Sequence, residues 1–406
     1  MFEFDAYRHR PAYFRDISLA KWQNWLWQQQ NAISNWQKLQ KVFPHLEEKW
    51  LEAAKIWDQR GLRFLLTPYV LSLVSKDIKG NPKENDVIWR QVFPAFDGLL
   101  HYSSANKGLT VRPDEYSPKK ENWEEKKEMI TPIAQHKYDN RVIIYTADIC
   151  LGYCVFCFRS LQSNAKQEKH GGKPFWKQTI EAIRARPQIE EVIFSGGDPL
   201  VFDNASVEAM LKDIRGISTV KAIRIHTRAW LHNPYRIDNV FCALLKKYEE
   251  TEMGVHTVHP KELTKDFKEA VERIRASGAH TLLMSDTPLI KGVNDDEKTL
   301  RELFMNLYLC GVKPYYLSHN MPNIPAAAAQ RTSVRKGVRL MNRLKRRISN
   351  TAMPEYIIAQ ETGKKTVPES ECGTPDFRYE KDKTGWPIIR FKNWKGRWVT
   401  YLDTLD

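Results

Sequence analysis

The chain contains little cysteine and no long apolar run, and each shortage excludes a class of protein. Its six cysteines in 406 residues are too sparse for a disulfide-stapled secreted domain. No segment reaches the roughly 18 apolar residues that a transmembrane helix needs. The N-terminal sequence MFEFDAYRHRPAYF lacks the basic-then-apolar pattern of a signal peptide. We therefore expect a cytoplasmic protein with no membrane partner.

Basic residues outnumber acidic ones, and the net charge of +14 does not exclude a nucleic-acid or acidic-protein partner. The densest basic run is VRKGVRLMNRLKRRI at 334–348, where apolar residues recur at helical spacing. The pattern predicts an amphipathic helix with a basic outer face. A solvated face is the preferred interpretation, and contact with RNA or an acidic protein is the alternative.

Three regions of the chain differ in pattern. Residues 1–135 are mostly helical, and their charge-rich stretch 103–135 is typical of a linker or wrapping arm. Residues 136–325 alternate short β-branched runs with helical segments, and residues 326–406 are a C-terminal α+β extension. The repeats predict an α/β fold with a parallel sheet, a partial (β/α)6 barrel with its active site at the C-terminal ends of the strands. The expected strands lie at 141–147, 191–196, 222–227, 253–258, 280–287 and 313–319.

Three of the six cysteines, Cys150, Cys154 and Cys157, fall within eight residues directly after the first expected strand. Thiolates are the ligands of iron–sulfur clusters, and four are usual. Three ligands leave one iron of a [4Fe–4S] cluster open to bind a reactive molecule. Zinc is the competing interpretation, but it needs a fourth Cys or His nearby, and the spacing of His170 is unusual for that role.

A glycine-rich turn, FSGGDPL, ends the second expected strand and contains Ser195, Gly196, Gly197 and Asp198. Paired glycines let a backbone approach a ligand closely, although an ordinary turn has the same composition. The turn lies one βα unit after the cysteines, so a barrel would bring both segments to the same mouth.

Together the two motifs resemble the radical S-adenosylmethionine (SAM) superfamily, in which CxxxCxxC follows the first barrel strand. The resemblance implies that the open iron chelates the amino and carboxylate groups of SAM, and that the glycine turn binds the amino group. It also implies a one-electron donor of the flavodoxin or ferredoxin type and a 5′-deoxyadenosyl radical that removes hydrogen from substrate. In such enzymes the cofactors carry out the chemistry, and the protein orients them.

Eight segments resemble the lysine 2,3-aminomutase family over nearly the whole chain. They occur in that family's order: RDISLAKWQNWLWQQQNAI, RFLLTPYVLSL, KYDNR, SGGDPL, HTVHP, IKGVNDD, KPYYL and PEYIIAQ. The resemblance implies pyridoxal phosphate (PLP), a small-molecule amino acid substrate and migration of its nitrogen. By position, Arg159 matches the arginine that holds the substrate carboxylate. Lys137, Tyr138 and Arg141 match residues that surround PLP.

The segment ETGKKTVP stands where the family has a glycine-rich run around its PLP lysine. Lys365 is the first candidate for the lysine that carries PLP, and Lys364 is the second. Three of the family's four glycines are missing, so the phosphate cradle is altered or PLP is absent. His256 and His259 match positions at a strand end that could touch PLP, SAM or substrate, with a structural role as the alternative.

The lysine enzymes of the family bind the distal ammonium with two aspartates, and their positions here are Met321 and Ala359. Neither residue balances a cation, and burying an unpaired ammonium is costly. The leading prediction is a SAM- and PLP-dependent amino acid 2,3-aminomutase for a substrate other than lysine. Nearby polar residues suggest a polar, neutral or anionic substrate side chain: His319, Asn320 and Gln360.

Two alternatives stay open. The first is a member of the same family without PLP, acting on another small molecule, a peptide or an RNA-linked substrate. The second is a zinc-stabilised, basic RNA-binding protein with no enzymatic activity. The family's Cys-rich C-terminal zinc segment is missing, so a zinc-linked dimer is not implied, and a homo-oligomer of another kind is compatible with the sequence.

Overall fold

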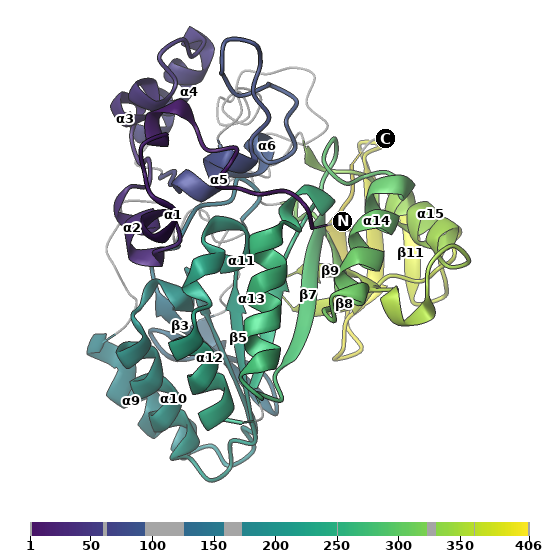
Figure 1. Cartoon of the computed structure of the whole chain (residues 1–406). Helices are drawn as coiled ribbons and strands as arrows, with labels where there is room; N and C mark the ends of the chain where they lie inside the picture. The colour runs from purple at the N-terminus through teal and green to yellow at the C-terminus, as the bar shows by residue number, and fades with distance from the viewer. Residues whose placement is uncertain are drawn as a thin grey trace.

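The computed structural model describes residues 2–59, 63–93, 126–157, 173–249, 251–322, 330–360 and 362–404. Figure 1 shows a large sheet with helices along one face, a group of N-terminal helices at one end and a smaller C-terminal sheet beside it. Within the described residues, no helix has both the length and the apolar character needed to cross a membrane.

The N-terminal region is helical, as expected. Its first helical stretch is divided in two, because Ser18 caps the first part and Asn24 starts a second one by accepting from the Trp27 amide. The region has its own aromatic-rich core, which includes Trp22 and Trp50 and extends to Val155 and Tyr235 of the next region. Its helices are α1 (Leu19–Trp22), α2 (Trp25–Gln30), α3 (Trp36–Val42), α4 (Glu48–Gln59), α5 (Pro68–Leu73) and α6 (Trp89–Val92).

The main sheet has ten strands in chain order, and the seven from β3 to β9 are parallel. All six expected strands are present, and the parallel sheet confirms the predicted α/β barrel-like class. The strands are β1 (Met129–Thr131), β2 (Ala134–Tyr138), β3 (Arg141–Ala147), β4 (Glu191–Gly196), β5 (Ala222–Thr227), β6 (Thr251–His256), β7 (Leu282–Leu289), β8 (Lys313–His319), β9 (Glu355–Gln360) and β10 (Gly363–Thr366).

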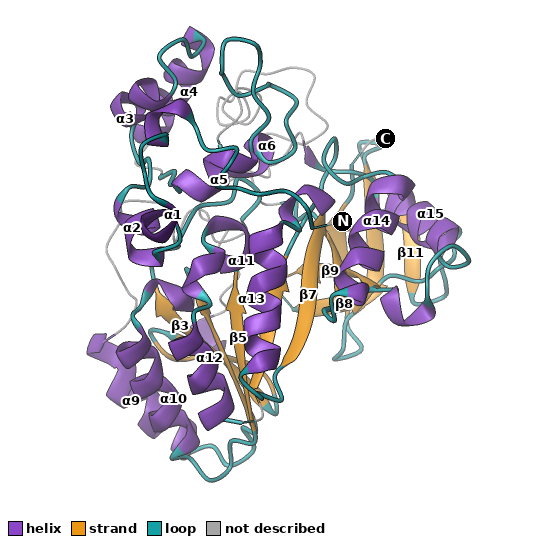
Figure 2. Ribbon diagram, viewed as in Figure 1, coloured by secondary structure: helices purple, strands orange, loops and turns teal. Residues whose placement is uncertain are grey.

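Helices cover one face of this sheet (Figure 2), where the apolar side chains of the strands are buried against them. Alternate residues of β5 show the pattern: Ile223 and Ile225 are buried in this core, whereas Arg224 and His226 face the other way. We call the side with Arg224 and His226 the inner face. The covering helices are α9 (Lys173–Arg184), α10 (Asn204–Arg215), α11 (Ala229–His232), α12 (Asn239–Lys247), α13 (Lys265–Ala276), α14 (Glu297–Leu309) and α15 (Val334–Leu344).

The sheet crosses both region boundaries expected from the sequence. The described part of the supposed linker forms β1 and begins β2, and β9 and β10, assigned to the extension, belong to the same sheet. The sheet curls until its two ends meet. At the meeting point, the Lys364 amide in β10 donates to the Tyr138 hydroxyl in β2 at 2.9 Å. Strands from 134 to 366 therefore enclose one interior.

The C-terminal extension adds a three-stranded antiparallel sheet of β11 (Phe377–Lys381), β12 (Pro387–Lys392) and β13 (Trp398–Leu402). The predicted basic helix is α15, with Val338 and Leu344 buried on its inner side. Acidic neighbours pair with much of its basic face and its C-terminal turn, through Lys336–Asp295, Arg339–Glu371, Lys345–Glu369 and Arg347–Glu297. This pairing favours the solvated-face interpretation over a partner contact.

Candidate active site

The three clustered cysteines lie in the loop after β3, at the C-terminal end of the parallel sheet. All three are partly exposed, and none of them is in a disulfide. Among the described residues, no three His, Cys, Asp or Glu side chains converge closely enough to hold a single metal ion. In a cluster each cysteine binds a different iron, so the sulfurs need not converge on one point, and three thiols in one half-buried loop fit a [4Fe–4S] cluster.

The glycine turn packs directly on this cysteine loop. Gly196 has φ +110°, which favours glycine, and a Cβ on Gly197 would lie 2.1 Å from the Ile149 carbonyl oxygen. The Gly197 amide donates to the Ala147 carbonyl at 2.6 Å, and the Asp198 amide donates to Ile149 at 2.9 Å. Ser195, next to last in β4, lies alongside, and its carbonyl accepts from the Thr146 hydroxyl at 3.0 Å. The paired glycines let the turn hold the backbone that carries Cys150.

The Asp198 side chain, expected among the cofactor-binding groups, points into the protein. It is buried and accepts from the Leu200 amide, the Thr227 hydroxyl and the Arg228 amide at 2.8–2.9 Å. Burial raises the pKa of Asp198, and these hydrogen bonds oppose the rise. The carboxylate thus joins the turn to the end of β5 as a structural link.

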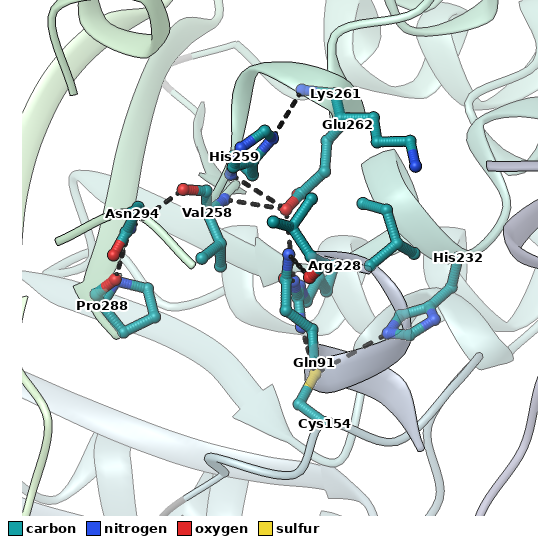
Figure 3. Close-up of polar contacts among 12 residues, drawn as sticks. Gln91, Cys154, Arg228, His232, Val258, His259, Lys261, Glu262, Pro288 and Asn294 are labelled. Atoms are coloured by element: carbon teal, nitrogen blue, oxygen red, sulfur yellow. Dashed lines mark hydrogen bonds and ion pairs between the residues drawn. The ribbon is translucent and has the colours of Figure 1, made fainter. Parts of the chain in front are cut away.

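Arg228 is a functional candidate that the sequence did not single out. It follows β5, and its Nη1 lies 2.6 Å from Cys154 Sγ. His232 Nε2 lies 3.7 Å from the same sulfur, and burial keeps the pKa of His232 well below its usual range. Figure 3 shows Arg228 and His232 converging on Cys154. The only signal available in the sequence was its position directly after an expected strand.

The inner face of the sheet carries a polar cluster farther from the cysteines. His226 Nδ1 lies 3.2 Å from His256 Nε2, and the Ser318 hydroxyl donates to Asp286 at 2.6 Å. Burial lowers the pKa of His256, and Asp286 opposes that shift. His256 thus lies beside His226 on the inner face of the sheet. His226 and Asp286 were not singled out from the sequence.

Lys364 and Lys365 point to opposite faces of β10, since side chains alternate along a strand. Lys364 Nζ lies 4.1 Å over the ring of Tyr316 on the inner face. Lys364 is exposed to solvent on this face, although protein atoms surround its amine. Burial lowers the pKa of its amine, Asp286 opposes this, and Arg224 and Arg141 add to it. Lys365, the first candidate from the sequence, lies on the other face, where its charge helps to lower the pKa of Asp376 near the C-terminal sheet.

The other residues expected around PLP lie at the joined ends of the sheet. Tyr138 accepts from the Lys364 amide, and the Arg141 guanidinium lies 4.8 Å over the Tyr138 ring. Arg141 Nε is buried with no hydrogen-bond partner among the described residues, which fits a site for an anionic phosphate. Lys137 instead pairs with Glu128, with its Nζ 3.4 Å from Glu128 Oε2.

His259 has a structural role. Its Nδ1 accepts from the Lys261 amide at 3.0 Å and caps the short helix Pro260–Glu262, while its own amide donates to Glu262. Burial lowers the pKa of His259 to about 4, so the ring is neutral. The capping contact gives His259 the structural role that the sequence offered as the alternative to a cofactor contact.

The two positions expected to select the substrate lie together. Met321 is buried and packs against Ala359 of β9 and Phe156 of the cysteine loop. His319 is occupied elsewhere, with Nδ1 2.6 Å from the Tyr401 hydroxyl and Nε2 2.8 Å from the Thr332 carbonyl. The Gln360 amide donates to Thr362. Arg159 and His170 lie outside the described residues.

Comparison with known proteins agrees with this geometry. The family model described as Radical SAM superfamily matches residues 144–304. The L-lysine 2,3-aminomutase of Haemophilus influenzae is 33% identical over 75% of this chain and 83% of its own length. That of Clostridium subterminale is 28% identical over 97% and 87%. The glutamate 2,3-aminomutase of Clostridioides difficile is 27% identical over 94% and 83%.

The matched superfamily implies SAM and a [4Fe–4S] cluster, a small-molecule substrate and a reductant. The barrel, the cysteine loop at its mouth and the relatives that share most of its length lead to one assignment. The chain is an enzyme of the lysine 2,3-aminomutase family within the radical SAM superfamily.

Proposed function

We propose that the protein is a PLP-dependent amino acid 2,3-aminomutase whose substrate is not lysine. Cys150, Cys154 and Cys157 would hold the cluster, and the turn Ser195–Gly197 would lie against SAM. The observation that carries the PLP assignment is the placement of Lys364 on the inner face, beside Tyr316 and among the charges of Asp286 and Arg224.

Lys364 suits a covalent bond to an aldehyde, because a lysine amine must lose its proton before it can attack. Its lowered pKa increases the neutral fraction at a given pH. The nearby Arg141, with its buried and unpartnered Nε, would hold the phosphate group. PLP bound in this way supplies electron delocalisation next to the migrating nitrogen. Tyr138 supports the arrangement by fixing the backbone of Lys364.

The substrate assignment rests on the patch of Met321, Ala359 and Phe156. These side chains offer neither a counter-charge nor a hydrogen-bond partner to a distal ammonium. Of the polar neighbours expected from the sequence, His319 has both ring nitrogens engaged within the fold, and neither Asn320 nor Gln360 carries a counter-charge. A relative named for glutamate supports substrate variation within the family.

Borohydride trapping tests the PLP assignment. Anaerobically reconstituted protein is incubated with PLP, reduced with borohydride and mapped by mass spectrometry. We expect the pyridoxyl adduct on Lys364, retention of the adduct in Lys365→Ala and its loss in Lys364→Ala. The two variants are matched controls, because they remove the same group from opposite faces of one strand. An intact cluster with no lysine adduct would refute the PLP assignment and favour a PLP-independent radical reaction.

Turnover of L-lysine tests the substrate assignment. Leaving a buried ammonium unpaired costs about 3 kcal/mol or more, which is at least about a hundredfold in kcat/KM. We therefore expect L-lysine to rank far below the best substrate when candidate amino acids are screened by the amount of β-amino acid that forms. The double variant Met321→Asp, Ala359→Asp should raise L-lysine turnover. Wild-type turnover of L-lysine equal to or above that of the best other amino acid would contradict the assignment.

A further inference from the structure

Arg228 is held rigidly beside the cysteine loop. Its backbone amide donates to Asp198 at 2.8 Å, and its side chain is almost fully buried. The guanidinium donates to Cys154 at 2.6 Å, lies 4.9 Å from the Phe156 ring centre and donates to the Gln91 side chain. These contacts hold one full positive charge next to the sulfur of Cys154.

The charge on Arg228 is only partly offset. Glu262 Oε1 lies 3.7 Å from Arg228 Nη2, beyond hydrogen-bond distance, and accepts from the Val258 and His259 amides at 3.2 and 3.1 Å. Figure 3 shows Glu262 on the far side of the guanidinium from Cys154. His232 Nε2 lies farther from this sulfur, at 3.7 Å. Among the described residues, Arg228 is therefore the nearer donor to Cys154, and the Glu262 carboxylate lies behind it.

We propose that Arg228 sets the reduction potential of the cluster by placing a buried positive charge and an N–H donor on the sulfur of Cys154. The inference rests on the proposed ligation of the cluster by Cys154. On activation, one electron passes from an external one-electron donor to the cluster, whose net charge becomes more negative by one as the donor is oxidised. A positive charge in a buried site stabilises the more negative state. Net charge and hydrogen bonds to the sulfurs are established determinants of cluster potentials.

Arg228 is thus a positioning residue that acts through the cysteine. The contact with Cys154 uses one N–H of the forked guanidinium. Arg228→Lys keeps the positive charge but loses this forked set of donors, whereas Arg228→Gln loses the charge. Glu262→Gln keeps an oxygen that can accept from the Val258 and His259 amides while it removes the offsetting negative charge. Arg347→Gln removes one positive charge from an exposed site and serves as the control for net charge.

The test is a potentiometric titration of the reconstituted full chain, followed by electron paramagnetic resonance of the reduced cluster. At the wild-type midpoint potential, Arg228→Gln should lower the ratio of reduced to oxidised cluster by about tenfold or more, where tenfold is 59 mV for one electron. Arg228→Lys should give a smaller decrease, Glu262→Gln an increase, and Arg347→Gln no change.

A wild-type midpoint in Arg228→Gln would overturn the inference. If that variant fails to assemble a cluster, Glu262→Gln decides, because an unchanged or lowered midpoint there would overturn the inference as well. Failure of the wild-type chain itself to assemble a cluster would instead refute the proposed function. The two failures are therefore distinguishable.

Discussion

Asp198 provides a direct test of whether the residue after the glycine pair serves the fold or the cofactor. Its buried carboxylate receives three donors, from Leu200, Thr227 and Arg228. Asp198→Ala leaves all three buried without an acceptor. Each such loss costs about 1–3 kcal/mol.

The expected cost of Asp198→Ala is smaller than the sum of these losses. Burial already raises the pKa of Asp198, so removing the carboxylate also relieves an unfavourable burial of charge. We expect a net decrease of about 3–5 kcal/mol in the free energy of unfolding. Asp198→Asn keeps one acceptor oxygen of similar shape, so its decrease should be about 1–2 kcal/mol.

The assay is urea unfolding of the three proteins, combined with SAM binding measured by equilibrium dialysis on reconstituted protein. The structural role predicts that stability falls in the order wild type, Asn, Ala. It also predicts that the Asn variant retains SAM binding. If both variants kept wild-type stability and both lost SAM, the carboxylate would be a ligand to the cofactor, and the reasoning from its hydrogen bonds would be refuted.

Two further predictions concern the glycine turn and one buried histidine, His319. Gly197→Ala places a Cβ 2.1 Å from the Ile149 carbonyl oxygen, so the cysteine loop must move and the iron content after reconstitution should fall. Gly216→Ala is the control, because its Cβ would meet no atom nearer than 3.3 Å, and it should keep the wild-type iron content. Burial lowers the pKa of His319 to about 3 from an ordinary 6.5, so its stabilising contribution is complete above about pH 6.5 and is lost as the pH falls toward 3. At pH 5 the loss is about 2 kcal/mol, and His319→Gln should flatten the dependence of the melting temperature on pH between 6.5 and 5; an unchanged slope would contradict it.

Several features of this protein were readable from the sequence because they depend on neighbours along the chain. The spacing of Cys150, Cys154 and Cys157 is local, and so is the glycine pair that follows one βα unit later. The alternation of short apolar runs with helical segments identified six strands of the parallel sheet. The Ser18 cap is local in the same sense, since a cap bonds within its own turn.

Other features depend on how distant segments meet. One residue along β10 decides between the inner and outer faces, so only the register of β10 on β9 distinguished Lys364 from Lys365. The pairing of β9 with β8 moved residues 355–366 from the expected extension into the barrel sheet. The contact between Arg228 and Cys154 joins residues that are 74 positions apart, so no local pattern in the sequence indicates it.

The sequence by itself thus determined the class of fold, the family resemblance and the set of residue types available for chemistry. The tertiary structure alone decided which of those side chains face one another. Asp198 and His259 illustrate the difference, because the motifs that contain them did not indicate the hydrogen bonds that their side chains make within the fold. The physical reason is that a motif specifies the backbone path nearby, whereas the direction of a side chain is set by strand register and by the packing of segments remote in the chain.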